Sequence, residues 1–179
     1  MSNSRRGLWF SAPRTETCPR GPRFWIGAWW PVAAGIAIIA VESTKYLGAD
    51  VTSHPLRVFF EAIFGPIGDL RWATIHHYIR KSGHFLGYGG LGLAWLRALW
   101  MSLPRSRFFF AAELALAGTA LVASWDEWHQ TILPNRTGSP WDILLDCCGA
   151  LFMLSAAFMY LRLRRPSLLH DRNRQVSPS

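Results

Sequence analysis

Residues 125–149, WDEWHQTILPNRTGSPWDILLDCCG, lie between two long apolar runs and are unusually rich in polar groups. Asp126, His129 and Gln130 stand at i, i+3 and i+4 and would share one face of a helix. A carboxylate beside a histidine can act as an oriented general base or as half of a metal site. Because one such pair without an HExxH or CxxC pattern supplies too few ligands, we expect neither a metal nor a cofactor. Glu127, the neighbouring acid, is a further candidate for general acid or base.

A second polar cluster, RKSGHFLGY, occupies residues 80–88 at the predicted start of another helix. Backbone N–H groups at a helix N-terminus favour anions, and the cations Arg80 and Lys81 would strengthen a phosphate or carboxylate site there. His84 and Tyr88 are one turn apart and share a face. In the alternative interpretation, the cations anchor the helix to lipid headgroups and the glycines after residue 86 allow a second helix to approach closely.

Three more charged residues follow within and after the loop of the first stretch. Arg136 has a planar fork that suits a carboxylate or phosphate. Asp142 lies near the start of the last predicted helix, and Asp146 lies one turn deeper, where an unpaired charge is costly. Asp146 therefore needs a partner, for which Arg136, Lys81 and His84 are the candidates. The alternative is an ion-pair network that only ties helix ends together.

The elements that position these residues are predicted to be membrane helices. Half of the chain is hydrophobic and only 17% is charged, which is typical of an integral membrane protein. We predict an all-α, polytopic membrane protein with four transmembrane helices, at residues 24–42, 83–101, 108–128 and 141–163. Short interfacial helices are predicted at 56–64 and 69–80, in the first extracytoplasmic connection. Inside the bundle, Arg97 and Glu113 are predicted to form an ion pair.

Basic residues predict the orientation. They concentrate in the amino-terminal tail, the loop between the second and third spans, and the carboxyl-terminal tail, which the positive-inside rule places in the cytoplasm. The predicted organisation is a mobile basic tail at 1–23, a four-helix transmembrane domain at 24–163 and a second basic tail at 164–179. Orientation accounts for the net charge of +8, so no nucleic-acid partner is expected. Both polar clusters then share the extracytoplasmic face.

Two spaced motifs resemble the VanZ-like membrane proteins. The first is K-x-x-H-F-x-x-Y-x-x-L, carried by Lys81, His84, Phe85, Tyr88 and Leu91. The second is D-E-x-x-Q-x-x-x-P-x-R-x-x-x-x-x-D-x-x-x-[ND]-x-x-G, carried by Asp126, Glu127, Gln130, Pro134, Arg136, Asp142, Asp146 and Gly149. Asp146 stands where that family usually has Asn. The resemblance implies a small protein of the bacterial cytoplasmic membrane, from a family associated with resistance to the glycopeptide teicoplanin.

Three functions are consistent with these residues. The favoured one is binding of a lipid-linked or anionic envelope ligand at the outer membrane–water interface, by Lys81, His84, Tyr88, Asp126, Glu127, Gln130, Arg136, Asp142 and Asp146. The second is an enzyme acting on a lipid-linked substrate, with His84 or Glu127 as general acid or base. The third is a structural or partner-binding protein. Membrane lipids or a lipid-linked precursor are the expected partners, and homo-oligomerisation stays open. A transport pathway has little room in four helices.

Overall fold

The computed structural model describes residues 21–44, 49–103, 108–133 and 138–164, and these form five α-helices and no strands. The helices are α1 (Pro22–Glu42), α2 (Ala49–Phe64), α3 (Asp69–Ser102), α4 (Phe108–Ile132) and α5 (Pro140–Arg164). The all-α prediction is therefore confirmed. Arg136, Pro134 and most of the two predicted tails, residues 1–20 and 165–179, lie outside the described residues. Residues 22–23 and 164, predicted as parts of the tails, belong to α1 and α5.

Local sequence explains where the helices begin and end. Pro22 and Pro140 open α1 and α5, where a missing N–H costs nothing. Ser139 precedes α5, and its Oγ accepts a hydrogen bond from the Trp141 N–H at 3.3 Å. Gly65 ends α2 with a φ of 79°, a left-handed conformation that glycine adopts without strain.

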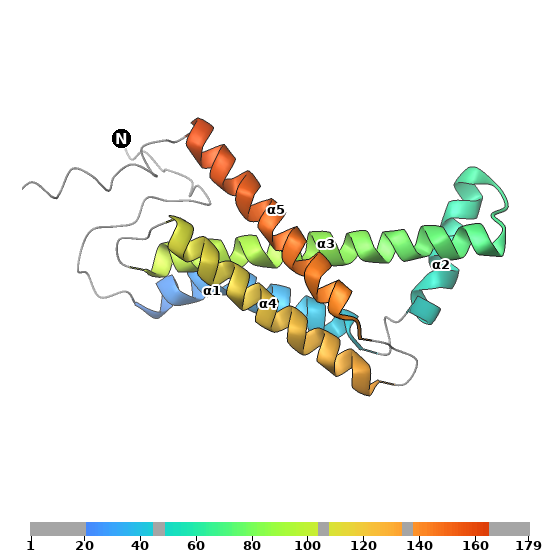
Figure 1. Ribbon diagram of the computed structural model, residues 1–179, viewed down its shortest axis with the longest axis horizontal. Helices are drawn as coiled ribbons and strands as arrows, with labels where there is room; N and C mark the ends of the chain where they lie inside the picture. Colours follow the sequence, from blue (N-terminus) through green and yellow to red (C-terminus); the bar gives the residue numbers. More distant parts are fainter. Residues whose placement is uncertain (1–20, 45–48, 104–107, 134–137, 165–179) are drawn as a thin grey trace, which may run out of the picture.

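The central helix is α3, which differs from the prediction of two helices with a break near residue 82. It is continuous over 34 residues, about 51 Å at a rise of about 1.5 Å per residue. No proline interrupts it, and a single Gly83 costs too little to stop a helix that is packed on both sides of that point. Figure 1 shows α1, α4 and α5 packed along its carboxyl-terminal part, while α2 crosses its amino-terminal end and forms a projecting arm.

Small residues set the close approach of α3 and α5. A Cβ on Gly92 would lie 3.1 Å from the Ala150 Cβ, and one on Gly89 would lie 3.0 Å from the Gly149 carbonyl oxygen. Gly87 and Gly90, also expected to admit a helix, face open space instead. The core beside this contact is built from large residues of α3, α4 and α5, namely Leu96, Trp100, Phe108, Leu154 and Leu161.

Arg97 does not form the ion pair predicted with Glu113. Its Nη1 donates to the carbonyl oxygens of Gly27 and Ala28 in α1, each at 3.0 Å. Pro31 explains this geometry, because it has no N–H to donate to the carbonyl four residues earlier, which is that of Gly27. The guanidinium of Arg97 therefore satisfies a carbonyl that the proline leaves without its helical partner.

The exterior of the bundle is apolar, whereas its interior contains buried acids. Exposed large side chains follow the outer faces of the helices, among them Trp30, Ile38, Phe109, Leu121, Leu151 and Phe152. Asp126, Glu127 and Asp146 are buried. Large apolar surfaces of this kind are stable only against lipid or a partner. Within the described ranges, α1, α4 and α5 are long and apolar enough to cross a membrane. The molecule is thus a helical membrane protein; α3 is not among these helices because His84, Arg97 and its glycines dilute its apolar character.

Candidate functional site

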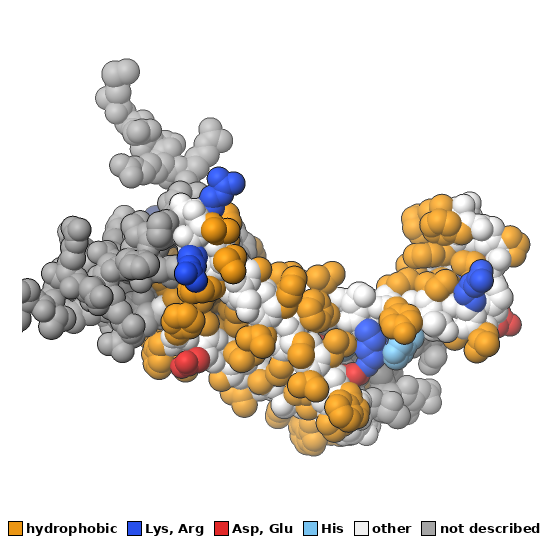
Figure 2. Space-filling view, turned by 45° about the horizontal axis from the view of Figure 1, so that its top comes forward, with side chains coloured by type: hydrophobic (Ala, Val, Ile, Leu, Met, Phe, Trp, Pro, Cys, Tyr) orange, Lys and Arg blue, Asp and Glu red, His pale blue; other side chains and the backbone are white. Residues whose placement is uncertain are grey.

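A pocket of about 300 Å³ opens where the arm leaves the bundle. Its walls come from the carboxyl-terminal ends of α1 and α4, the middle of α3, and α2. They combine apolar Ile39, Leu56 and Ile79 with polar and charged residues. Figure 2 shows basic, acidic and histidine side chains gathered at this junction, while hydrophobic side chains cover much of the remaining face. A pocket with both kinds of lining suits an amphiphilic ligand.

One wall of the pocket is a hydrogen-bonded group around Asp126. Its Oδ2 accepts from the Tyr88 hydroxyl at 3.0 Å and from Gln130 Nε2 at 3.1 Å. Asp126, Tyr88 and Gln130 are all buried. Because two donors hold the carboxylate, it is oriented as an acceptor at the pocket wall.

Behind this wall lies a second group, formed by one residue from each of three helices. His84 of α3 places its Nδ1 3.4 Å from Asp146 Oδ1 of α5, and its ring stacks on Tyr88 with centroids 6.1 Å apart. Glu127 of α4 accepts the Ser139 N–H on Oε2 at 2.7 Å, which joins α4 to the start of α5. We call His84, Glu127 and Asp146 the three-helix triad. Its histidine also lines the pocket.

Lys81 and Asp142 form an ion pair beside the triad. Asp142 lies in the first turn of α5, where the helix dipole favours a carboxylate. Lys81 thus pairs with Asp142 rather than with Asp146. Of the partners predicted for Asp146, it is His84 that lies close to it. The helix N-terminus expected near residue 83 does not exist, since α3 is continuous there. Its backbone N–H groups are therefore bonded within the helix and cannot bind an anion.

The predicted site residues thus come together, with two exceptions. Arg136 lies outside the described residues. His129, expected to pair with Asp126, instead contacts Ser43 Oγ through Nδ1 at 3.4 Å. Glu42 also lines the pocket. Sequence analysis gave no ligand role to His76, which lines the pocket together with Arg80 and His84. Their signal is helical spacing, because residues 76, 80 and 84 stand at i, i+4 and i+8 on one face of α3.

One protein-family model matches the part of the chain that contains this site. The model of the VanZ/LLP1 family matches residues 29–162, from early α1 to the end of α5. The chain belongs to the VanZ/LLP1 family. The resemblance inferred from the two motifs is therefore confirmed, and both motifs lie inside the matched range. No curated protein and no solved structure matches the chain in the corresponding comparisons.

Chemically, the site of this VanZ/LLP1 protein offers an anchor and a set of acid–base groups. Arg80 presents a cation to the pocket, and Asp126 presents an oriented carboxylate. The three-helix triad adds an imidazole beside two buried acids. Charge interactions are strong in such a water-poor setting, so these groups can hold a polar headgroup or move a proton.

Proposed function

We propose that this VanZ/LLP1 membrane protein binds the anionic headgroup of a lipid or lipid-linked envelope molecule in the pocket at the base of the arm. The observation that carries the proposal is the mixed lining, which combines the cation Arg80 and the imidazole of His84 with apolar Ile39 and Leu56. A phosphate would pair with the Arg80 guanidinium, whose planar fork suits it. The first carbons of the lipid tails would contact the apolar residues of the pocket.

The position of the pocket along the membrane normal supports a lipid headgroup as its occupant. Trp125, Trp128 and Trp141 are exposed at the ends of α4 and α5 that lie near it. Exposed tryptophans of membrane proteins concentrate at headgroup level. The pocket would therefore open where phosphates and glycerol groups lie, and a lipid could enter it from the bilayer.

The proposal includes a topology with four spans. The carboxyl-terminal part of α3, residues 83–101, would be the fourth span, because it is enclosed by the three helices that are apolar enough to cross. Both termini would be cytoplasmic and the arm extracytoplasmic, in a bacterial cytoplasmic membrane. In a variant lacking its own cysteines, H77C on the exposed face of the arm should react with an impermeant maleimide added to intact cells. Reaction only after the membrane is opened would overturn this orientation.

Binding can be tested by native mass spectrometry of the purified protein with three probes: phosphatidylglycerol, a polyprenyl phosphate and phosphatidylcholine. We expect bound anionic lipid on the wild type and a loss of roughly tenfold in affinity with R80Q, as for one charge-assisted contact of about 1.5 kcal/mol. R71Q is the matched control, since Arg71 lies on the same helix but is exposed. Equal binding of all three probes by the wild type and R80Q would contradict the proposal.

A membrane enzyme is the second candidate, because the His84 imidazole both lines the pocket and approaches Asp146. Such an enzyme would use His84 or Glu127 to transfer a proton during attack by water or a substrate hydroxyl on a lipid-linked substrate. Turnover of a labelled phospholipid or polyprenyl phosphate by wild type, lost in H84Q and E127Q, would favour it. Unchanged substrate across both lipid classes would leave binding as the function.

A further inference from the structure

The three-helix triad has the composition and geometry of a metal-ligand set. His84, Glu127 and Asp146 each offer one ligand atom, and these atoms all lie within 4.8 Å of one another. Each comes from a different helix, so the position of all three depends on the packing of α3, α4 and α5. We propose that the triad binds one divalent first-row transition ion, such as Zn²⁺ or Mn²⁺. This inference goes beyond headgroup binding and does not depend on it.

Polar atoms without partners carry the proposal. Among the described residues, no hydrogen bond reaches His84 Nδ1, Glu127 Oε1 or either carboxylate oxygen of Asp146. The 3.4 Å approach of His84 to Asp146 lacks hydrogen-bond geometry. Asp146 is 0% exposed and Glu127 is 3% exposed, so water does not satisfy these atoms freely. Buried polar atoms are almost always partnered, and a charge without a partner is more costly still.

The surrounding hydrogen bonds leave these atoms directed at one another. Glu127 Oε2 is held by the Ser139 N–H, which leaves Oε1 buried and without a hydrogen-bond partner. Stacking on Tyr88 fixes the orientation of the His84 ring. Partners that orient a ligand in this way are typical of metal sites. Asp126 and Asp142 are not among the ligands grouped here, and they pair instead with Tyr88 and Lys81.

Charge favours a divalent ion over a proton or a monovalent cation. A neutral imidazole with two carboxylates carries a charge of about −2, which one divalent ion neutralises in this low-dielectric interior. One nitrogen and two oxygens suit Zn²⁺ or Mn²⁺, whereas Ca²⁺ takes about 6–8 oxygens. Ligand atoms around a tetrahedral ion lie about 3.4 Å apart, given bonds of about 2.1 Å. The ligand atoms of the triad lie within 4.8 Å of one another, so small side-chain rotations would be needed to reach that spacing. Three protein ligands would then leave one tetrahedral position open.

The test is metal binding by the full-length protein, purified in detergent without a histidine tag and stripped with a chelator. After loading with Zn²⁺ or Mn²⁺ and desalting, elemental analysis should find one ion per chain and thermal melting should shift upward. E127Q and D146N, which keep the side-chain shapes, should each lose at least roughly tenfold in affinity. E113Q is the matched control, because Glu113 is an exposed acid on the same helix as Glu127.

The outcome that overturns the proposal is equal metal content in wild type, E127Q and D146N, or no retained ion in the wild type. If D146N does not fold, Co²⁺ loading of the wild type decides the matter. An intense visible spectrum of four- or five-coordinate Co²⁺ would support the site. The weak spectrum of the hydrated ion would refute it.

Discussion

A Cβ on Gly149 of α5 would lie 2.1 Å from the carbonyl oxygen of Phe85 in α3. Phe85 directly follows His84 in α3, and Gly149 lies about one turn after Asp146 in α5, so the contact is next to both triad residues of these helices. Because the obstacle is backbone, it cannot move aside as a flexible side chain would. The glycine therefore fixes the distance at which the two helices cross and, with it, the geometry of the site.

G149A is accordingly expected to separate α3 from α5 and to destabilise the protein by about 3 kcal/mol. Thermal melting followed by size-exclusion chromatography would measure the loss. G90A is the control, since a Cβ there meets nothing within 4 Å. An unchanged melting temperature for G149A would contradict the close crossing.

R97M is expected to destabilise the contact of α1 with α3 by about 2 kcal/mol, because two charge-assisted hydrogen bonds to α1 carbonyls are lost. P31A restores an N–H that can bond the Gly27 carbonyl within α1. The cost of R97M should therefore be smaller in the P31A background. Equal costs in both backgrounds, measured by the same melting assay, would show that the proline does not create the need for Arg97.

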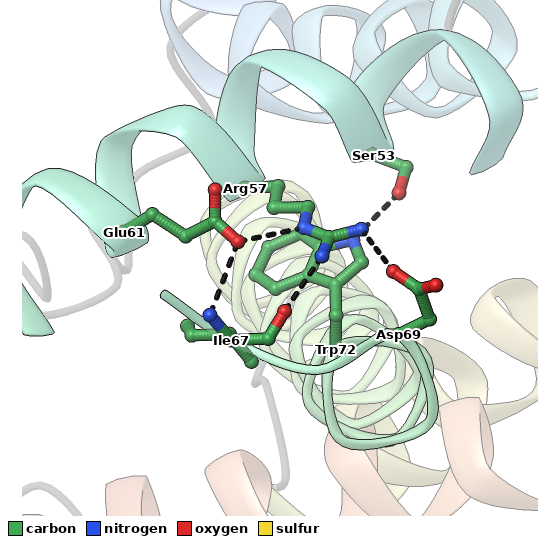
Figure 3. Close-up of polar contacts among 6 residues, drawn as sticks. All are labelled: Ser53, Arg57, Glu61, Ile67, Asp69 and Trp72. Atoms are coloured by element: carbon green, nitrogen blue, oxygen red, sulfur yellow. Dashed lines mark hydrogen bonds and ion pairs between the residues drawn. The ribbon is translucent and has the colours of Figure 1, made fainter. Parts of the chain in front are cut away.

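Arg57 closes the turn between α2 and α3, as Figure 3 shows. Its guanidinium donates to Glu61 Oε1 at 2.9 Å, Asp69 Oδ1 at 2.8 Å and the Ile67 carbonyl at 2.6 Å. R57M keeps the stem but loses these bonds, so hydrogen exchange at the Ile67 amide should accelerate. R71M, on an exposed position of α3, should leave exchange at Ile67 unchanged. Identical exchange in wild type and R57M would count against this role.

The arm should loosen in mild acid. Burial lowers the pKa of His76 below its usual 6.5, and the charge of Arg80 lowers it further. Between the lowered pKa and 6.5 the unfolded arm binds more protons, so stability is fully present above about pH 6.5 and falls as the pH drops below it. Protection of the α2 amides from hydrogen exchange, corrected for the intrinsic exchange rate at each pH, should therefore fall from pH 7.5 to pH 5.5.

H76Q should remove most of this pH dependence, whereas H77Q, at the exposed neighbouring position, should keep it.

A separate loss of stability is expected at lower pH. The hydrogen bond from Arg57, with that from the Ile67 N–H, holds the pKa of Glu61 below its usual 4.5. That contribution is present above pH 4.5 and is lost as the pH falls through the lowered pKa. A single transition near pH 4 in the wild type would contradict the role of His76.

Helix positions were largely readable from the sequence. Predicted spans at 24–42, 108–128 and 141–163 fall within α1, α4 and α5, because apolar run length and flanking Pro or Gly act locally. The continuity of α3 was not readable in this way. Its polar residues 80–84 look like a helix boundary, and only packing against other helices shows that the backbone continues.

The candidate site, like the fold, was predictable from the sequence only in part. Helical spacing alone indicated that His84 and Tyr88 share a face, and both occur at the site. The expectation of no metal came from the spacing of ligands within one segment, where no metal motif occurs. Such spacing could not reveal the three-helix triad, because His84, Glu127 and Asp146 are brought together by three separate helices.

The sequence by itself determined an all-helical membrane protein of the VanZ/LLP1 family and the residue types at its polar end, since these follow from local periodicity, hydropathy and motif spacing. Tertiary structure decided the pairings: Lys81 with Asp142, Tyr88 with Asp126, and Arg97 with the carbonyl that Pro31 leaves. The physical reason is that a partner depends on the depth and rotation of each helix. Those are set by contacts as close as Gly149 against Phe85, between residues far apart in the chain.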